Sequence, residues 1–305
     1  MESKGFSIVT GAFGYTGKYI TSKLLSMGEE VRTITGHQNR ENTFGTKISV
    51  SPFNFDEPRK LVDTIKGAKT LYNTYWVRFD YKETTFDKAI NNTKILIRAA
   101  EEAGVKRFVH VSIANPSLES NLPYYKGKAM LENAITSSSL SYAIVRPTLI
   151  FGLEDILINN IAWLLRKFPI FAIPGKGDYL VQPIFVGDYA NIAIEAAQQK
   201  DNTIIDAVGP EIFSFDQMVC LIAKKIRSNS KIIHLSPGIS LFLSKIISKF
   251  IGDVLLTKDE VKGLMSNLLV SNEPPRGQVK LSNWLDENAN KVGAKRNSEL
   301  ERHYR

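Results

Sequence analysis

The residues with the clearest chemical potential are a serine, a tyrosine and a lysine near the middle of the chain. Ser112 ends the apolar run "VKRFVHVS", and Tyr124 and Lys128 follow in "PYYKGK". Residues four apart share one face of a helix, so the ammonium would lie beside the phenol. An adjacent ammonium stabilises the phenolate and lowers the pKa of tyrosine from its ordinary value of about 10. With Ser112 holding a carbonyl or alcohol oxygen, Tyr124 would be general acid and base for hydride transfer; Tyr125 is its nearest competitor.

A glycine-rich loop near the start of the chain indicates what would supply the hydride. "TGAFGYTGKYI" places Gly11, Gly14 and Gly17 directly after the apolar run "FSIV". In a dinucleotide-binding turn the first glycine allows a tight bend, the second admits a pyrophosphate, and the third packs the helix on the strand. The helix N-terminus then faces the phosphates. A P-loop is excluded, because Tyr19 follows Gly-Lys and Ala12 stands where its first glycine would be.

The elements that would position these residues alternate between strand and helix through the first half of the chain. Strands are expected at "GFSIVTG", "EVRTITG", "KISVSPFNF", "AKTLYNTY", "VKRFVHVSI" and "SYAIVRPTLIFG". This order predicts an α/β fold, a Rossmann doubly wound parallel sheet that binds ligands at the carboxyl ends of its strands.

The second half of the chain is less regular. We expect the dinucleotide-binding domain over residues 1–152, completed by about 183–209, and a smaller, mainly helical substrate lobe over 153–182 and 210–305. Residues 153–182 read as a helix followed by a Pro/Gly-rich loop, and the region from Ile212 onward as helices and loops without sheet alternation.

The second strand indicates which dinucleotide is preferred. NAD-preferring proteins hold the adenosine ribose with an acidic residue near the end of this strand. Here the stretch is "RTITGHQNR", without an acid, and Gly36, His37 and Arg40 make its surroundings neutral to basic. A 2′-phosphate would be attracted there, which favours NADP(H) over NAD(H) unless Arg40 is only a solvated loop residue.

Composition limits the other classes of function. The 305 residues are 43% hydrophobic and 23% charged, with a net charge of +8 but no run of like charge, so we expect no nucleic-acid binding. One cysteine and four unpaired histidines predict neither a disulfide framework nor a metal site. Without a transmembrane span or room for a signal peptide, the expected location is cytoplasmic.

Five pieces of the chain form a recognisable set of motifs: "GAFGYTG", "VHVS", "YYKGK", "RPTLIFG" and "VQPIFVGDYA". In these pieces the chain resembles the short-chain dehydrogenases/reductases of the extended or atypical kind, in the NAD-dependent epimerase/dehydratase superfamily. The pieces "IFGLEDILIN" and "VQPIFVGDYA" look most like the nucleotide-binding accessory subunits of respiratory complex I and their prokaryotic relatives. The similarity spans roughly residues 5–210.

The resemblance also implies residue roles. Lys128 would contact the nicotinamide ribose, Pro147 would lie against the nicotinamide, and Asn54 and Phe55 would border the adenine. The stretch "NTYW", Asn73 to Trp76, would line the cofactor channel, with Tyr75 and Trp76 towards the substrate. The third strand ends in "FNF" where the family usually has an Asp, which departs from the family's adenine contact. The expected cofactor contacts are Gly11, Phe13, Gly14, Tyr15, Thr16, Gly17, Gly36, His37, Arg40, Asn54, Phe55, Asn73, Thr74, Tyr75, Lys128 and Pro147.

Two functions remain open: an oxidoreductase or epimerase acting on an alcohol or carbonyl, and a non-catalytic NADP(H)-binding accessory or assembly protein of a membrane redox complex. The small-molecule substrate and the oligomeric state are not indicated. A further segment, "ISLFLSKIISKFIGDVLL", has apolar residues at helical spacing with Lys245 and Lys249 on a narrower polar side. It reads either as a lid or core helix over a substrate cleft or as a helix lying on an anionic bilayer, peripheral to the membrane.

Overall fold

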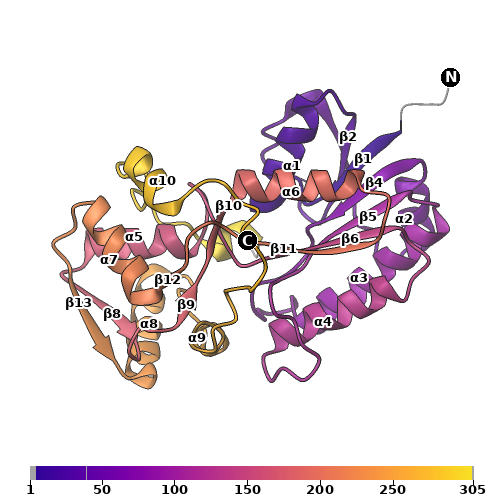
Figure 1. Ribbon diagram of the computed structural model, residues 1–305. Coiled ribbons are helices and arrows are strands. Elements are labelled where there is room, and N and C mark those ends of the chain that lie inside the picture. Colours follow the sequence, from indigo (N-terminus) through magenta and orange to yellow (C-terminus); the bar gives the residue numbers. More distant parts are fainter. Residues whose placement is uncertain (1–4, 39, 304–305) are drawn as a thin grey trace. The chain divides into compact units, whose positions relative to one another are not determined.

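The computed structural model describes residues 5–38 and 40–303 and divides the chain into two compact units. Unit 1 runs up to Pro147 and includes Tyr189–Asp206, and unit 2 comprises Thr148–Asp188 and the residues from Ala207 onward. Figure 1 colours the chain along its sequence, from indigo at the N-terminus to yellow at the C-terminus.

Unit 1 is built on a seven-stranded parallel sheet with the order β11-β6-β5-β4-β1-β2-β3. Its strands are β1 (Phe6–Thr10), β2 (Val31–Thr35), β3 (Ile48–Pro52), β4 (Ala68–Asn73), β5 (Arg107–Val111), β6 (Tyr142–Pro147) and β11 (Thr203–Ala207). From β1 the chain steps outward to β2 and β3, then returns to the other side of β1 with β4. This reversal puts the switch point between β1 and β4, where such sheets bind ligands. The predicted fold class is confirmed.

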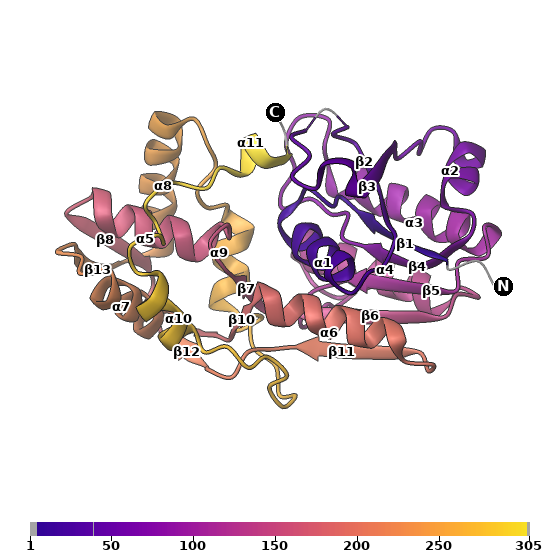
Figure 2. The same ribbon diagram turned by 90° about the horizontal axis from the view of Figure 1, so that it is seen from above.

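Helices cover both faces of this sheet. They are α1 (Tyr15–Ser26), α2 (Pro58–Ile65), α3 (Phe86–Glu102), α4 (Pro123–Thr136) and α6 (Val186–Gln198), with a 3-10 turn at Gly45–Lys47. Figures 1 and 2 show α1 and α6 on one face and α2, α3 and α4 on the other. Helix α1 begins two residues before the predicted start at Gly17, because its first turn forms immediately after Gly14.

Burial explains why the strands of unit 1 form. Every residue of β1 is buried, so this strand is covered on both faces, as a central strand of a parallel sheet must be. One core cluster joins four neighbouring strands to apolar side chains of α2 and α3. The strands contribute Ile8, Leu71, Phe108 and Ile144. The carboxyl ends of β1, β4 and β5 are thereby held on a rigid base.

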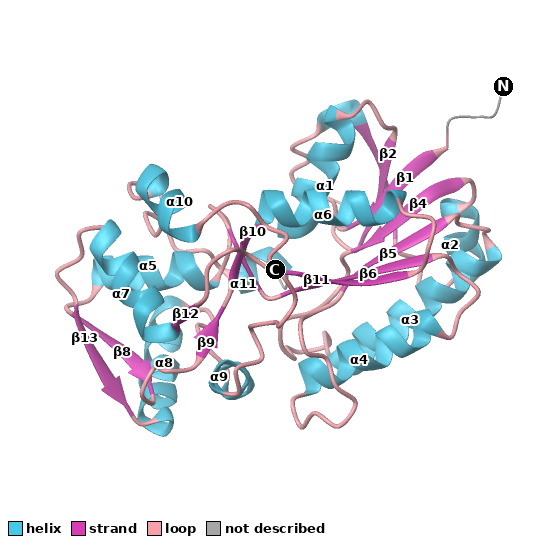
Figure 3. Ribbon diagram, in the orientation of Figure 1, coloured by secondary structure: helices cyan, strands magenta, loops and turns pink. Residues whose placement is uncertain are grey.

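Unit 2 combines short strand pairs with helices, which Figure 3 distinguishes by colour. Its strands are β7 (Leu149–Phe151), β8 (Ile170–Pro174), β9 (Leu180–Val181), β10 (Pro183–Phe185), β12 (Phe213–Ser214) and β13 (Lys231–Leu235). Its helices are α5 (Leu157–Lys167), α7 (Phe215–Lys225), α8 (Pro237–Ile251), α9 (Lys258–Met265), α10 (Leu281–Asn288) and α11 (Glu299–His303). Phe151, Leu165, Met218, Ile222 and Trp284 contribute to its buried core.

Two expectations for this region are wrong. The Pro/Gly-rich stretch after α5 contains strand β8, and the region beyond Ile212 contains β13, which pairs with β8 in parallel from Lys231 opposite Ile170 to Leu235 opposite Pro174. Each strand supplies the other's backbone hydrogen bonds across about 60 residues of sequence, so neither is visible in a local pattern.

The chain beyond α10 is fastened to α5 by side-chain amides. Asn159 accepts the Gly293 N–H at 3.2 Å, and Asn160 accepts the Asn297 N–H at 3.1 Å. A Cβ on Gly293 would come within 2.5 Å of the backbone of α5, and its φ is +67°, so only glycine fits there.

Residues 5–38 and 40–303 offer no candidate for a metal cluster or for a membrane-spanning helix. Neither range contains a group of three or more His, Cys, Asp and Glu side chains arranged to hold a metal ion. No helix in these ranges is both long enough and apolar enough to traverse a bilayer.

Candidate functional site

The glycine loop between β1 and α1 has the backbone geometry of a dinucleotide turn. Gly11 adopts a φ of +64°, and the Gly14 N–H donates to the Gly11 carbonyl at 2.8 Å. A Cβ on Gly17 would stand 2.3 Å from the Gly11 oxygen, and one on Gly14 would stand 3.1 Å from it. The third glycine is therefore required for the helix to approach the strand this closely.

The start of α1 has neither a side-chain cap nor an acidic residue in its first turn. Its N-cap is Gly14. A helix start of this kind suits a phosphate, whose charge complements the positive end of the helix dipole. Phe13, Tyr15 and Thr16 are half-buried around this turn.

Hydrogen bonds of the Thr10 and Thr33 hydroxyls hold the glycine loop in place. The buried Thr10 hydroxyl accepts the Thr74 N–H at 2.7 Å and the Tyr75 N–H at 3.0 Å, while the Thr74 hydroxyl donates to the Thr10 carbonyl at 2.5 Å. On the other side, the Thr33 hydroxyl donates to the Val9 carbonyl at 2.8 Å and accepts the Ala12 N–H at 3.1 Å. These bonds tie the ends of β4 and β2 to the glycine loop.

Asn73 is a buried part of this support. Its carbonyl oxygen accepts from the Thr10 hydroxyl at 3.2 Å and from the Tyr75 N–H at 3.2 Å, which leaves its amide group to donate to His110 Nδ1 at 3.0 Å. His110 is then the tautomer with its proton on Nε2. Burial lowers the pKa of His110 well below its usual range, and the nearby Lys128 lowers it further, so this histidine is neutral. The contact of Asn73 with a cofactor stays a prediction.

Aromatic side chains gather at the ends of β3 and β4, where the adenine contact is predicted. Phe53 and Phe55 stack at 4.7 Å between ring centroids, and Tyr75 packs against them at 5.0 and 5.4 Å. The Tyr75 hydroxyl accepts from Asn92 Nδ2 at 2.9 Å, and burial raises the pKa of this phenol. Asn54, between the two phenylalanines, adopts a φ of +50°, which turns the chain there.

The expected binding residues after β2 lie on the surface. Gly36 and His37 are exposed and Arg40 is half-buried. The His37 N–H donates to the Thr35 hydroxyl at 3.1 Å, and the Arg40 N–H donates to the His37 carbonyl at 3.2 Å.

Lys128 lies on α4 and is completely buried. Its ammonium donates to the Val111 carbonyl at 2.6 Å and sits 4.5 Å from the centre of the Trp76 ring. Loss of hydration lowers the pKa of Lys128 to about 7, although Glu132 opposes this effect. The lysine predicted to serve the site is thus held at the end of β5 and changes its charge near neutrality.

Ser112 follows at the same strand end. Its hydroxyl donates to Glu132 Oε1 at 2.5 Å, and Glu132 also receives a two-pronged ion pair from Arg146, at 2.9 Å from Nε and 2.5 Å from Nη2. The hydrogen bond to Glu132 raises the pKa of Arg146. Pro147 is buried next to this arginine at the end of β6, and its carbonyl accepts the Ala114 N–H at 2.8 Å.

Tyr124 stands in an aromatic group around Trp76. Its ring meets Trp76 edge-to-face at 5.7 Å and Phe86 at 6.1 Å, and it meets Tyr125 at 5.7 Å. Trp76 therefore contacts both members of the predicted tyrosine–lysine pair. Its indole rests on α4 at Gly127, where an added Cβ would lie 2.9 Å from the ring.

The structure separates two neighbours that the resemblance places together towards the substrate. Tyr75 packs with Phe53 and Phe55, whereas Trp76 packs with Tyr124 and Lys128. Both residues follow the end of β4 at Asn73, and their rings join different aromatic groups.

Glu132 and Arg146 are site residues that sequence reasoning missed. One signal was present, because Glu132 is four residues after Lys128, the same helical spacing that singled out Tyr124. No local pattern connects Glu132 with Arg146, which lies on β6. His110 likewise carries no sequence signal for its bond with Asn73, since the two meet only across β4 and β5.

A doubly wound parallel sheet with a glycine turn at its switch point is the arrangement that binds dinucleotides in many α/β proteins. Residues 11–153 match the model of a family described as NAD(P)H-binding. The subunit 9 protein of the NADH dehydrogenase (ubiquinone) 1 alpha subcomplex from Arabidopsis thaliana is 25% identical over 87% of this chain and 70% of its own length. The mouse protein of the same name is 29% identical over 63% of this chain, an alignment that spans 53% of the mouse protein.

Solved structures agree on the fold. The triphenylmethane reductase of Citrobacter sp., complexed with NADP(H), is 16% identical and superposes with a TM-score of 0.75 over 93% of this chain and 99% of its own. MoeE5, in complex with UDP-glucose and NAD, is 19% identical with a TM-score of 0.69 over 94% and 98%. Residues 11–153 therefore carry an NAD(P)H-binding domain by their match to the family model, and the chain is homologous to the subunit 9 proteins.

Proposed function

We propose that the chain is an NADP(H)-dependent oxidoreductase or epimerase that transfers hydride to or from a carbon bearing an alcohol or carbonyl. The observation that carries this proposal is the joint placement of Ser112 and Lys128 at the end of β5, in the unit that holds the glycine turn at the sheet's switch point. The nicotinamide supplies or accepts the hydride when it is bound.

The residues present fit such a cofactor. The close approach at Gly17, the side-chain-free N-cap at Gly14 and the absence of acids in the first turn of α1 suit a diphosphate. Phe53, Phe55 and Tyr75 offer aromatic surface for an adenine.

The preference for NADP(H) rests on charge after β2. This segment has no carboxylate to hold a ribose hydroxyl, and it offers His37 and Arg40 to a 2′-phosphate. Arg40→Ala should therefore weaken NADPH binding while leaving NADH binding nearly unchanged, as measured by titration of nicotinamide fluorescence. An equal loss for both dinucleotides would refute this role of Arg40.

Each polar residue then has a distinct task. Tyr124 would exchange a proton with the substrate oxygen, and Lys128, when protonated, would favour the phenolate form. Because the Ser112 hydroxyl donates to Glu132, its oxygen is left to accept a hydrogen bond, which suits an alcohol better than a carbonyl. Glu132 and Arg146 are positioning residues that hold Ser112 in this state.

The proposal is tested by turnover with matched tyrosine variants. The purified chain with NADPH is screened against a quinone, an aldehyde, a triphenylmethane dye and UDP-glucose, following nicotinamide absorbance and sugar epimerisation. Once a probe is turned over, Tyr124→Phe should lower kcat at least 100-fold, whereas Tyr125→Phe should retain most activity. Full activity in Tyr124→Phe would refute the assignment, and loss only in Tyr125→Phe would transfer the role to its neighbour.

A second candidate is a non-catalytic, cofactor-holding accessory protein of a membrane redox complex. Two observations favour it: Trp76 covers Lys128 and packs on Tyr124, and the curated relatives reported above are named as NADH dehydrogenase subunits. In that case the purified chain retains nucleotide that exchanges slowly, turns over none of the probes and copurifies with a membrane-bound NADH dehydrogenase. Rapid nucleotide exchange together with turnover would exclude this candidate.

A further inference from the structure

Helix α8 in unit 2 presents an apolar face to solvent. Ile239, Phe242, Leu243 and Ile246 follow the spacing of one helical face and are 52%, 63%, 38% and 39% exposed. A core or lid helix would bury these side chains, so the sequence-based expectation of a core helix is wrong for this face.

The less exposed side of α8 carries serines among its apolar residues. Ser240 is buried, and within the described part of the chain the hydroxyls of Ser240 and Ser244 have no hydrogen-bond partner. Unpaired hydroxyls are costly to bury, while apolar side chains gain nothing from water. Leu241, Ile247 and Ile251 are half-buried, and the Ser248 hydroxyl accepts the Leu255 N–H at 3.1 Å, so packing within unit 2 uses only part of the apolar surface of α8. The exposed stripe is left for a partner outside the chain. Figure 2 shows α8 at the margin of unit 2, beyond β8 and α5.

Charge around the stripe identifies the occupant. Lys245 and Lys249 are exposed and lie three and seven residues after Phe242, which places them along the Phe242 edge of the stripe. The helix from Pro237 to Ile251 contains no acidic residue, and the whole chain has a net charge of +8. An apolar protein surface would complement the apolar residues of α8 alone. An anionic lipid surface complements both these residues and the adjacent lysines.

The size of the helix agrees with a surface position. Its 15 residues are too few to span a bilayer, and no helix in residues 5–38 or 40–303 can do so. The four exposed apolar side chains offer an area on the order of 300–400 Å², which is as large as the functional patches of many monomers.

We propose that α8 docks the chain on an anionic phospholipid bilayer, with Ile239, Phe242, Leu243 and Ile246 inserted among the acyl chains and Lys245 and Lys249 at the headgroups.

The test measures cosedimentation of the full chain with vesicles. One set is pure phosphatidylcholine, and in the other about one third of the lipid is phosphatidylglycerol. We expect binding to the anionic vesicles, with little binding to the neutral ones. The double variant Ile239→Ser/Phe242→Ser should lower the partition coefficient at least tenfold. Its control is Ile212→Ser, which removes a 53% exposed isoleucine elsewhere in unit 2 and should bind normally.

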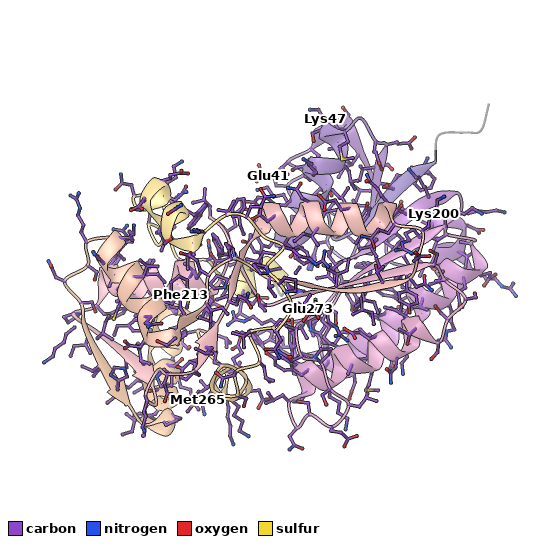
Figure 4. All side chains as sticks on the ribbon, viewed as in Figure 1. Glu41, Lys47, Lys200, Phe213, Met265 and Glu273 are labelled. Atoms are coloured by element: carbon purple, nitrogen blue, oxygen red, sulfur yellow. The ribbon has the colours of Figure 1, made fainter. Side chains whose placement is uncertain are left out.

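The charge contribution is tested separately. Lys245→Gln/Lys249→Gln should weaken binding to anionic vesicles by about fivefold per lysine and leave neutral vesicles unaffected. The matched control, Lys200→Gln/Lys291→Gln, changes two exposed lysines outside α8, of which Lys200 follows α6 (Figure 4). Thermal unfolding checks that each variant is folded, which is expected because all these side chains are exposed.

Three results would overturn the proposal. The first is no binding to anionic vesicles by the folded chain. The second is unchanged binding in Ile239→Ser/Phe242→Ser. The third is self-association of the wild-type chain in sedimentation velocity, lost in Ile239→Ser/Phe242→Ser, while neither protein binds vesicles. That result would assign the exposed apolar face of α8 to contact with a second copy of the chain.

Discussion

The buried ammonium of Lys128 makes the stability of the protein depend on pH in a direction that can be calculated. Burial lowers the pKa of Lys128 from 10.5 to about 7 in the folded chain. Between these values the unfolded chain binds more protons than the folded one, so the free energy of unfolding rises with pH. For a single group with these two pKa values, the gain between pH 7 and pH 9 is about 2 kcal/mol. Well below pH 7, Lys128 is protonated in both the folded and the unfolded chain, and the buried ammonium destabilises the folded chain by its full amount.

Replacement of the lysine isolates this contribution. Lys128→Met keeps the length and apolar contacts of the side chain but removes the titration. Urea unfolding at pH 7, 8 and 9 gives the stability of each protein, and the wild type should gain about 2 kcal/mol relative to the variant across this range. Lys126→Met is the control, since it removes an exposed lysine from the same helix and should leave the pH dependence unchanged. Parallel pH dependence in wild type and Lys128→Met would refute the account of a desolvated ammonium.

Other substitutions test the packing on which the site depends. Trp76→Ala should admit water to Lys128 and bring its pKa back towards the usual range, so the rise in stability between pH 7 and 9 should shrink; an unchanged rise would show that the indole does not shield the amine. Gly17→Ala should abolish NADPH binding in fluorescence titration, because the new Cβ would stand 2.3 Å from a backbone oxygen, whereas Gly238→Ala, with nothing within 4 Å, should bind normally. Gly209→Ala places a Cβ 1.7 Å from a backbone oxygen and should lower the free energy of unfolding by about 3 kcal/mol, measured in urea; a loss below about 1 kcal/mol would contradict this packing.

Sequence patterns were sufficient where structure is local. Alternating strands and helices predicted the parallel sheet, and the spacing of Gly11, Gly14 and Gly17 located the turn whose backbone the structure shows. The spacing of Tyr124 and Lys128 predicted that both lie on one helix, and both lie on α4. In each case the residues that interact lie within one element or at the junction of two consecutive elements.

Patterns failed where partners are distant or where a face must be chosen. Arg146 meets Glu132 only because β6 pairs with β5 and α4 packs against β6, and β13 forms because β8 offers it an edge. For α8, the period of the apolar residues established a helix but not which side faces the protein. That choice depends on everything packed around the helix, which no window of sequence contains.

The central claim is that backbone amides at the first bend of the sheet hold the diphosphate of a nicotinamide dinucleotide. The most direct measurement is calorimetric titration of the nucleotide-free chain with NADPH, NADP⁺, NADH and NAD⁺, repeated with Gly17→Ala. We predict one site per chain that binds the phosphorylated dinucleotides more tightly than NADH and NAD⁺, and no site in the variant. A folded chain that binds none of the four, or a variant that binds as well as the wild type, would contradict the account.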